Sequence, residues 1–207
     1  DLHSTSRRQR QMCIRDRDAI IAADSGMDFL YENGVMPDII VGDFDSATTK
    51  ALEYFERKGQ TEIHRLNPIK DDTDSEAALH LAFEKTKGDI FLLGGTGTRL
   101  DHVLGNIAIL GQGFVQDRHI FLLDEHNRIR LIQKECRIKK EEQYGKYVSV
   151  VSFCGVARGV SESGVFYPLD HVDLQPFTSL GISNEIVDEE AVITVEDGTL
   201  IVIESKD

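Results

Sequence analysis

The chain has 207 residues, of which 41% are hydrophobic and 29% are charged, and its formal net charge is −13. This composition excludes a disordered or collagen-like chain, and the apolar runs are too short for a membrane-spanning helix, so we expect no membrane partner. The acidic balance argues against a nucleic-acid partner, because phosphate backbones are bound through an excess of Lys and Arg.

The N-terminus and the cysteines set the expected context. Residues 1–17 are rich in arginine and have neither a helical or strand period nor the apolar stretch of a signal peptide. We expect a disordered or non-native leader; the alternative is a basic arm for anionic surfaces. Cys13, Cys136 and Cys154 form no CxxC pair, which is typical of reduced thiols, and we expect a cytoplasmic protein.

Residues 18–124 alternate between short apolar runs and amphipathic stretches. The expected strands span 19–23, 38–41, 62–66, 89–93 and 119–123. The expected helices span 27–33, 48–58, 73–87 and 101–110. The third helix begins with the capping-box spacing of Thr73 and Glu76. This alternation predicts an α/β domain with a mainly parallel sheet and flanking helices.

The helical signal is lost after residue 124, and residues 125–207 read as short strands separated by turn residues. We expect these strands at 128–133, 137–140, 146–153, 157–161, 165–167, 185–187, 191–195 and 200–204. The pattern predicts an all-β second domain, a sandwich or barrel.

Two acidic motifs fall where such a sheet binds ligands. GDFDS (42–46) follows an apolar strand directly, so Asp43 and Asp45 can aim at one cation beyond the strand end. DDTD (71–74) opens the Thr73 helix, where Asp71, Asp72 and Asp74 repel one another and bound Mg²⁺ would relieve that repulsion. Acidic residues that only cap the helices after each motif remain the alternative.

A glycine-rich segment, GGTGTRLDH (94–102), closes a strand and opens a helix. Its backbone N–H groups can approach phosphate oxygens, and the Arg99 guanidinium can donate two hydrogen bonds to one phosphate. The candidate ligand-binding residues here are Thr96, Gly97, Arg99, Asp101, His102 and Asn106. Together the three segments favour Mg²⁺-assisted phosphoryl chemistry, although neither a Walker A motif nor a kinase-type loop occurs.

The chain resembles the thiamine pyrophosphokinase family over nearly all of residues 19–207. The matching segments, in order, are AADSGMDFLYENGVMPDIIVGDFDS (22–46), KDDTDSEAAL (70–79), GGTGTRLDHVLGNI (94–107), SGVFYPL (163–169) and SLGISNE (179–185). The resemblance implies an α/β domain that binds ATP and Mg²⁺ and a β domain that binds thiamine. It also implies a homodimer, with thiamine between the α/β domain of one subunit and the β domain of the other.

The resemblance further implies roles for matching residues. Mg²⁺ and the phosphates would be surrounded by Asp43, Asp45, Asp71 and Asp74, with Asp101 nearby. The nucleotide region would be lined by Asp24, Arg99, His102 and Asn106. Thiamine would face Ser179, Ser183 and Asn184, which by themselves read as a polar turn. The implied reaction is an in-line attack of the thiamine hydroxyl on the β-phosphorus of ATP, with AMP leaving.

Two departures and two alternatives accompany the resemblance. The arginine-rich leader takes the place of the family's first strand and glycine loop, and Thr98 stands where glycine is expected. One alternative is a phosphatase of the haloacid-dehalogenase type, since Asp43-Phe44-Asp45-Ser46 resembles its nucleophilic DxD. The other is a thiamine- or nucleotide-binding module with impaired catalysis.

Overall fold

The computed structural model describes residues 19–45, 47–67, 69 and 72–207, so the predicted leader at 1–17 lies outside the described residues. The chain folds as two units, Asp1–Gly88 and Asp89–Asp207. The first contains β1 (Ile21–Ala23), α2 (Gly26–Glu32), β2 (Ile39–Gly42), α3 (Thr49–Lys58), β3 (Glu62–Arg65) and α4 (Asp74–Lys85).

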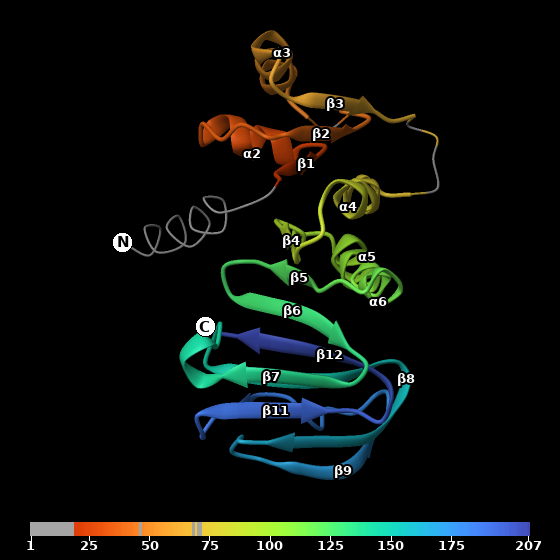
Figure 1. The fold of residues 1–207 in the computed structure, drawn as a ribbon, viewed down its shortest axis with the longest axis vertical. Coiled ribbons are helices and arrows are strands. Elements are labelled where there is room, and N and C mark those ends of the chain that lie inside the picture. The colour runs from red at the N-terminus through yellow and green to blue at the C-terminus, as the bar shows by residue number, and fades with distance from the viewer. Residues whose placement is uncertain (1–18, 46, 68, 70–71) are drawn as a thin grey trace. The chain divides into compact units, whose positions relative to one another are not determined.

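The first unit is a parallel sheet in the order β1-β2-β3, covered by helices (Figure 1). Ile40 of β2 joins a buried cluster with Met27 and Leu30 of α2 and Phe55 of α3. Side chains alternate between the faces of a strand, so Val41 lies on the opposite face, and α4 contacts β1 and β2. The sheet therefore carries helices on both faces, as the sequence predicts.

The second unit begins with β4 (Ile90–Leu93), α5 (Leu100–Ile109), α6 (Gln112–Gln116) and β5 (Ile120–Leu123). It continues with β6 (Asn127–Ile132), β7 (Glu135–Lys139), the 3-10 turn η1 (Lys140–Glu142), β8 (Tyr147–Ser163), β9 (Leu169–Leu174), β10 (Asn184–Glu185), β11 (Glu190–Thr194) and β12 (Asp197–Ser205). The sheet order is β4-β5-β6-β12-β8-β11-β7, and β9 and β10 also pair with β8.

Pairing in this second sheet changes from parallel to antiparallel along its order. β4 and β5 are parallel, and β5 pairs with β6 antiparallel, after which the other strands continue antiparallel as a curled sheet (Figure 1). Residues at alternate positions along these strands, such as Val150 of β8, Ile193 of β11 and Val202 of β12, point into one buried cluster. The predicted fold class, an α/β part followed by an all-β part, is confirmed.

The β-rich part also buries a charged network. Glu204 is 1% exposed. Its carboxylate accepts hydrogen bonds from Arg128 Nε at 2.7 Å, an Arg130 guanidinium nitrogen at 2.9 Å and Tyr144 N at 2.9 Å. A buried carboxylate with this many donors is fully compensated, so the network ties β6 and β12 together.

Several predicted elements differ from the structure. The predicted strands at 146–153 and 157–161 are one long strand, β8, because positive φ angles at Cys154 (61°) and Gly155 (142°) bend it without ending its pairing. The predicted strand at 165–167 contributes one isolated bridge, from Val165 to Ile186. The sequence does not predict helix α6 or strand β9, since segments of five and six residues are too short to show a clear periodicity.

The ends of helices follow local chemistry. Thr73 accepts a hydrogen bond from Glu76 N at 3.2 Å, as the capping-box spacing predicts. The same helix ends at Lys85 rather than at residue 87, because Thr86 leaves the helical conformation and its hydroxyl donates to Ala82 O at 2.9 Å. Across the described ranges, no helix is long and apolar enough to cross a membrane.

Candidate active site

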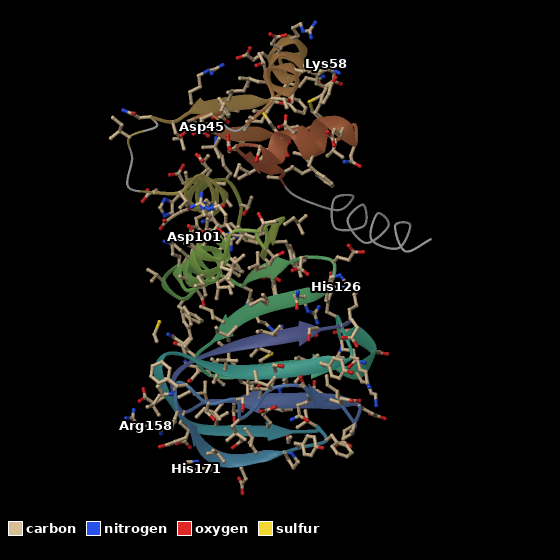
Figure 2. All side chains as sticks on the ribbon, turned by 180° about the vertical axis from the view of Figure 1, so that it is seen from behind. Asp45, Lys58, Asp101, His126, Arg158 and His171 are labelled. Carbon is tan, nitrogen blue, oxygen red and sulfur yellow. The ribbon has the colours of Figure 1, made fainter. Side chains whose placement is uncertain are left out.

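Three carboxylates gather where β1 and β2 end. Asp24 follows β1 directly, and Asp43 and Asp45 follow β2 (Asp45 is labelled in Figure 2). One oxygen from each of the three lies within 4.8 Å of the others. Carboxyl ends of parallel strands are where open α/β sheets bind ligands, and closely spaced carboxylate oxygens suit a hard cation such as Mg²⁺.

The parallel register brings these carboxylates together. Ala23 of β1 pairs with Val41 of β2, and Asp24 N donates to Val41 O at 2.8 Å. A Cβ added to Gly42 would lie 3.1 Å from the Asp24 Cα, so glycine permits this close approach. Phe44 turns the chain at φ 65°, and Asp45 N donates to Asp43 Oδ1 at 3.1 Å.

Asp24 is the member of this cluster that sequence reasoning assigned to the nucleotide and not to the metal. The sequence does place Asp24 at the end of a strand, as it places Asp43 at the end of the next one. Neighbouring parallel strands end at the same edge of a sheet, so the two residues belong to the same region.

The second acidic motif lies at the start of α4. Asp74 is the first residue of that helix and Asp72 is exposed, whereas Asp71 lies outside the described residues. Asp72 lines a cavity of about 200 Å³ together with His64, His80 and Glu84. Within the part of the chain that the structure describes, the metal-like cluster contains neither Asp72 nor Asp74.

The glycine-rich loop of the second unit holds an exposed ion pair. An Arg99 guanidinium nitrogen lies 2.6 Å from Asp101 Oδ2, and His102 N donates to Asp101 Oδ1 at 3.0 Å (Asp101 is labelled in Figure 2). The hydrogen bond from Arg99 is the main cause that lowers the pKa of Asp101 to about 2. Asp101 is therefore ionised throughout the neutral range and holds Arg99 at the start of α5.

Other residues of this loop anchor it to the sheet. Asn106 Nδ2 donates to Gly95 O at 2.8 Å, so Asn106 fastens the loop to α5. Burial would raise the pKa of Asp124, at the end of β5, but hydrogen bonds from Thr96 and Asn127 outweigh it and lower that pKa. A Cβ on Gly97 would meet nothing within 4 Å, which leaves open space for a ligand above this glycine.

The segment predicted to face thiamine lies beside β8. Ser179 and Ser183 are exposed, and Ser183 has φ 58° with its N–H donating to Ser149 Oγ at 2.9 Å. Asn184 is 3% exposed. Its amide oxygen accepts from Tyr167 N at 2.9 Å, and its amide nitrogen donates to Tyr167 O at 2.8 Å. Asn184 thus fixes the Tyr167 backbone from inside the sheet.

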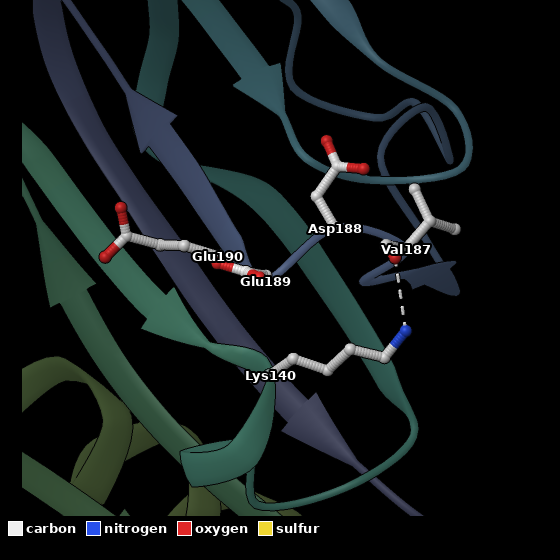
Figure 3. Close-up of a pocket in the computed structure, with 5 residues that line it drawn as sticks. All are labelled: Lys140, Val187, Asp188, Glu189 and Glu190. Carbon is white, nitrogen blue, oxygen red and sulfur yellow. Dashed lines mark hydrogen bonds between the residues drawn. The ribbon is translucent and has the colours of Figure 1, made fainter.

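A larger cavity of about 560 Å³ lies beside η1 and is lined by Lys140, Val187, Asp188, Glu189 and Glu190. Figure 3 shows that the acidic side chains diverge, while Lys140 Nζ donates to Val187 O at 3.2 Å. Because these carboxylates do not converge, the cavity lacks the donor geometry of a metal or phosphate site.

The fold and the acidic strand ends define a class of protein, an α/β ligand-binding protein with an appended β-rich part. The family model "Thiamin pyrophosphokinase, catalytic domain" matches residues 11–122, and "Thiamin pyrophosphokinase, vitamin B1 binding domain" matches residues 135–200. The chain belongs to the thiamin pyrophosphokinase family. It is accordingly an ATP-using diphosphotransferase of thiamine diphosphate synthesis, and the phosphatase alternative is not favoured.

Individual relatives agree with this assignment. Thiamine pyrophosphokinase of Bacillus subtilis (strain 168) is 34% identical over 188 residues, which cover 90% of this chain and 87% of that protein. A crystal structure of thiamine pyrophosphokinase from Bacillus subtilis matches with a TM-score of 0.83 at 33% identity, covering 90% of this chain and 87% of that one. A thiamin pyrophosphokinase family protein from Enterococcus faecalis gives 0.80 at 29% identity, covering 90% and 88%.

Proposed function

We propose that the chain transfers the diphosphoryl group of ATP to the hydroxyl of thiamine at a site that includes Asp24, Asp43 and Asp45. Family membership supports the reaction. The observation that supports the site is the gathering of three carboxylate oxygens within 4.8 Å of one another at the ends of β1 and β2.

Mg²⁺ is the cation that fits this donor set, because every donor is a carboxylate oxygen. Asp43 and Asp45 would hold it with Asp24, and the resemblance adds Asp71 and Asp74 from the second motif. Bound there, Mg²⁺ would offset negative charge on the triphosphate.

The bond changes of the transfer balance within the two substrates. The thiamine hydroxyl oxygen forms a bond to the β-phosphorus, and the bond from that phosphorus to the oxygen bridging to the α-phosphorus breaks. The bridging oxygen leaves with AMP, and a carboxylate of the acidic segments accepts the hydroxyl proton. Asp101 is a poor candidate for this base, since its pKa is about 2. Its role is to orient Arg99 toward the phosphates.

The glycine-rich loop serves the nucleotide in this proposal. Gly97 leaves room for phosphate oxygens to approach the backbone, and Arg99 supplies positive charge beside them. Thr96 and Asn106 act by anchoring the loop to β5 and α5, since both are engaged in hydrogen bonds within the protein. His102, in the first turn of α5, lines the same region.

Thiamine recognition is assigned to the β-rich part. We propose that residues 18–124 bind ATP and Mg²⁺ and that residues 125–207 bind thiamine, in a cytoplasmic enzyme. Ser179 and Ser183 present exposed hydroxyls to the substrate, whereas Asn184 acts through the turn that it holds, because its amide is already bonded to Tyr167.

Product analysis tests the proposed reaction. The chain is incubated with ATP, thiamine and Mg²⁺, and the products are separated by chromatography. Equal amounts of AMP and thiamine diphosphate are expected. Release of inorganic phosphate alone would indicate a hydrolase, and substrate binding without turnover would indicate the impaired module.

We further propose a homodimer in which each thiamine site combines the α/β part of one subunit with the β-rich part of the other. Exposed apolar side chains near the thiamine segment support an interface there: Phe166, Tyr167, Phe177, Leu180, Ile182 and Val187. Mixing Asp43→Asn chains with Ser183→Ala chains tests it. The assay uses thiamine well below the wild-type KM, where the Ser183→Ala dimer turns over slowly. Hybrid dimers would contain one intact shared site, so activity above the sum of the two separate variants is expected. Activity no greater than that sum contradicts the shared site.

A further inference from the structure

Glu162 is a buried carboxyl group that the proposed reaction does not use. It lies near the end of β8 and is 1% exposed. Its Oε2 accepts from Asn184 Nδ2 at 3.3 Å. Its Oε1 is buried, and none of the described residues offers it a hydrogen-bond partner. The other buried glutamate, Glu204, has two arginines, so Glu162 stands out as poorly compensated.

The surroundings of Glu162 are apolar. It pairs with Ile193 of β11 on one side and Leu169 of β9 on the other. Ile193 is fully buried, and Val160, two residues earlier on β8, is also fully buried. An ionised carboxylate in such a place is costly, because a single long hydrogen bond replaces its hydration.

Charged groups on the neighbouring strands are directed elsewhere. Glu185 of β10 pairs with Lys146, and Glu190 of β11 pairs with Arg137. The titratable residues of β9 are exposed: Asp170, His171 and Asp173. Burial accordingly raises the pKa of Glu162 to about 7, although the Asn184 hydrogen bond opposes the rise.

Among the described residues, Glu162 forms its side-chain hydrogen bond with Asn184, the residue that holds the thiamine segment. Asn184 Nδ2 donates both to Glu162 Oε2 and to Tyr167 O. The amide nitrogen of Asn184 has two N–H donors, one for each acceptor, so its position sets both hydrogen bonds at once. A charged Glu162 would attract this nitrogen more strongly and so strain its bond to Tyr167 O. Ser183, the adjacent candidate for thiamine contact, is tied to the same strand through Ser149.

We propose that Glu162 is a positioning residue whose protonated carboxyl group keeps Asn184, Tyr167 and Ser183 in the arrangement that receives thiamine, and whose ionisation loosens that arrangement. The inference rests on the proposed function for its effect on thiamine. Its structural half, the coupling of Glu162 to the Tyr167 backbone, stands independently.

The first test compares thiamine kinetics of the wild type and Glu162→Gln, which keeps the shape but cannot ionise. At saturating ATP, the wild-type KM for thiamine is expected to rise about tenfold from pH 6 to pH 8, as the protonated fraction falls from about 0.9 to 0.1. The KM for ATP at saturating thiamine is expected to change equally in both proteins. In Glu162→Gln the KM for thiamine should be nearly independent of pH.

A matched control separates this effect from a general change of charge. Glu189→Gln removes an exposed carboxylate and should keep the wild-type profile. Glu162→Leu, a second variant unable to ionise, should also lose the pH dependence and guards against a folding defect specific to Gln. The same pH profile in the wild type and both Glu162 variants, or a KM that falls as pH rises, would overturn the proposal.

Hydrogen exchange of the Tyr167 amide supplies a readout that does not need thiamine. After correction for intrinsic exchange, its protection in the wild type should fall from pH 6 to pH 8, and in Glu162→Gln it should not. Equal behaviour of the two proteins overturns the coupling. Failure of the wild type to bind thiamine at any pH would instead overturn the proposed function.

Discussion

Carboxylates are used in opposite ways in two regions of the molecule. At the ends of β1 and β2, Asp24, Asp43 and Asp45 bring ligand oxygens together at the rim of a sheet. In the β-rich part, Glu204 is buried against Arg128 and Arg130. A carboxylate that faces arginines is satisfied by the fold, whereas carboxylates that face one another repel, and in the proposed site a bound cation would relieve that repulsion. The two arrangements therefore predict a structural role for Glu204 and a functional role for the three aspartates.

The largest expected effect comes from the acidic motifs of the first unit. Asp43→Asn should lower kcat by about 10³-fold or more, because the cation that offsets phosphate charge would be held poorly. Asp74→Asn should likewise abolish turnover. Circular dichroism should show both variants folded. Glu53→Gln, on the exposed side of α3, is the control and should keep full activity. Retained activity in Asp74→Asn would remove that residue from the site.

Replacement of the structural carboxylate, Glu204, should lower stability and leave activity unchanged. Glu204→Gln should lower the free energy of unfolding by about 3 kcal/mol, because two partly buried arginines lose their counter-charge. The activity per folded molecule should stay the same. Urea unfolding measures the change. Glu135→Gln, which breaks an exposed pair with Arg137, should change the free energy of unfolding far less, because water screens exposed charges. A similarly small loss in Glu204→Gln would contradict the structural role of the Glu204 network.

A smaller effect is expected on the thiamine side. Ser183→Ala should raise the KM for thiamine about tenfold, equivalent to roughly 1.4 kcal/mol, by removing one hydroxyl contact. The KM for ATP should stay unchanged. Ser152 lies on β8, the strand that pairs with β12, so Ser152→Ala is the control in which a serine outside the thiamine segment is replaced. Equal changes in both KM values would contradict the assignment of Ser183 to thiamine.

Glu162 is expected to affect the pH dependence of stability rather than turnover. Its folded pKa of about 7 lies above the model-compound value of 4.5. The folded state therefore binds a proton that the unfolded state releases between these values. This contribution to stability is complete below pH 4.5 and is lost as pH rises to about 7, by at most about 1.4 kcal/mol per pH unit. Unfolding free energies should fall across this window in the wild type relative to Glu162→Gln; parallel curves would contradict the assignment.

Much of the first unit was predictable because its signals are local. Gly59 takes the left-handed conformation that ends α3, and Thr73 caps α4, as their sequence positions indicate. Clustering of Asp43 with Asp45 is consistent with their expected approach to one cation. The predicted domain boundary at residue 124 and the assigned roles stay predictions.

The features that the sequence does not predict depend on contacts between segments that are distant along the chain. The bend at Cys154 looks like a turn in sequence, yet β12 pairs with β8 before and after it. Asn184 reads as an exposed turn residue, but Tyr167 and Glu162 bury its amide. Asp24 follows a strand as Asp43 does, which the sequence shows, but only the register of β1 on β2 brings their oxygens into one cluster. Periodicity carries no information on such pairings.

Divalent-cation binding tests the central claim most directly. Mn²⁺ affinity can be measured by electron paramagnetic resonance for the wild type and for Asp24→Asn, with Glu53→Gln as the charge-matched control. The account predicts that Asp24→Asn binds Mn²⁺ at least about tenfold more weakly, because one of three carboxylate ligands is lost. Equal affinity in all three proteins would show that the carboxylates at the ends of β1 and β2 do not hold the metal.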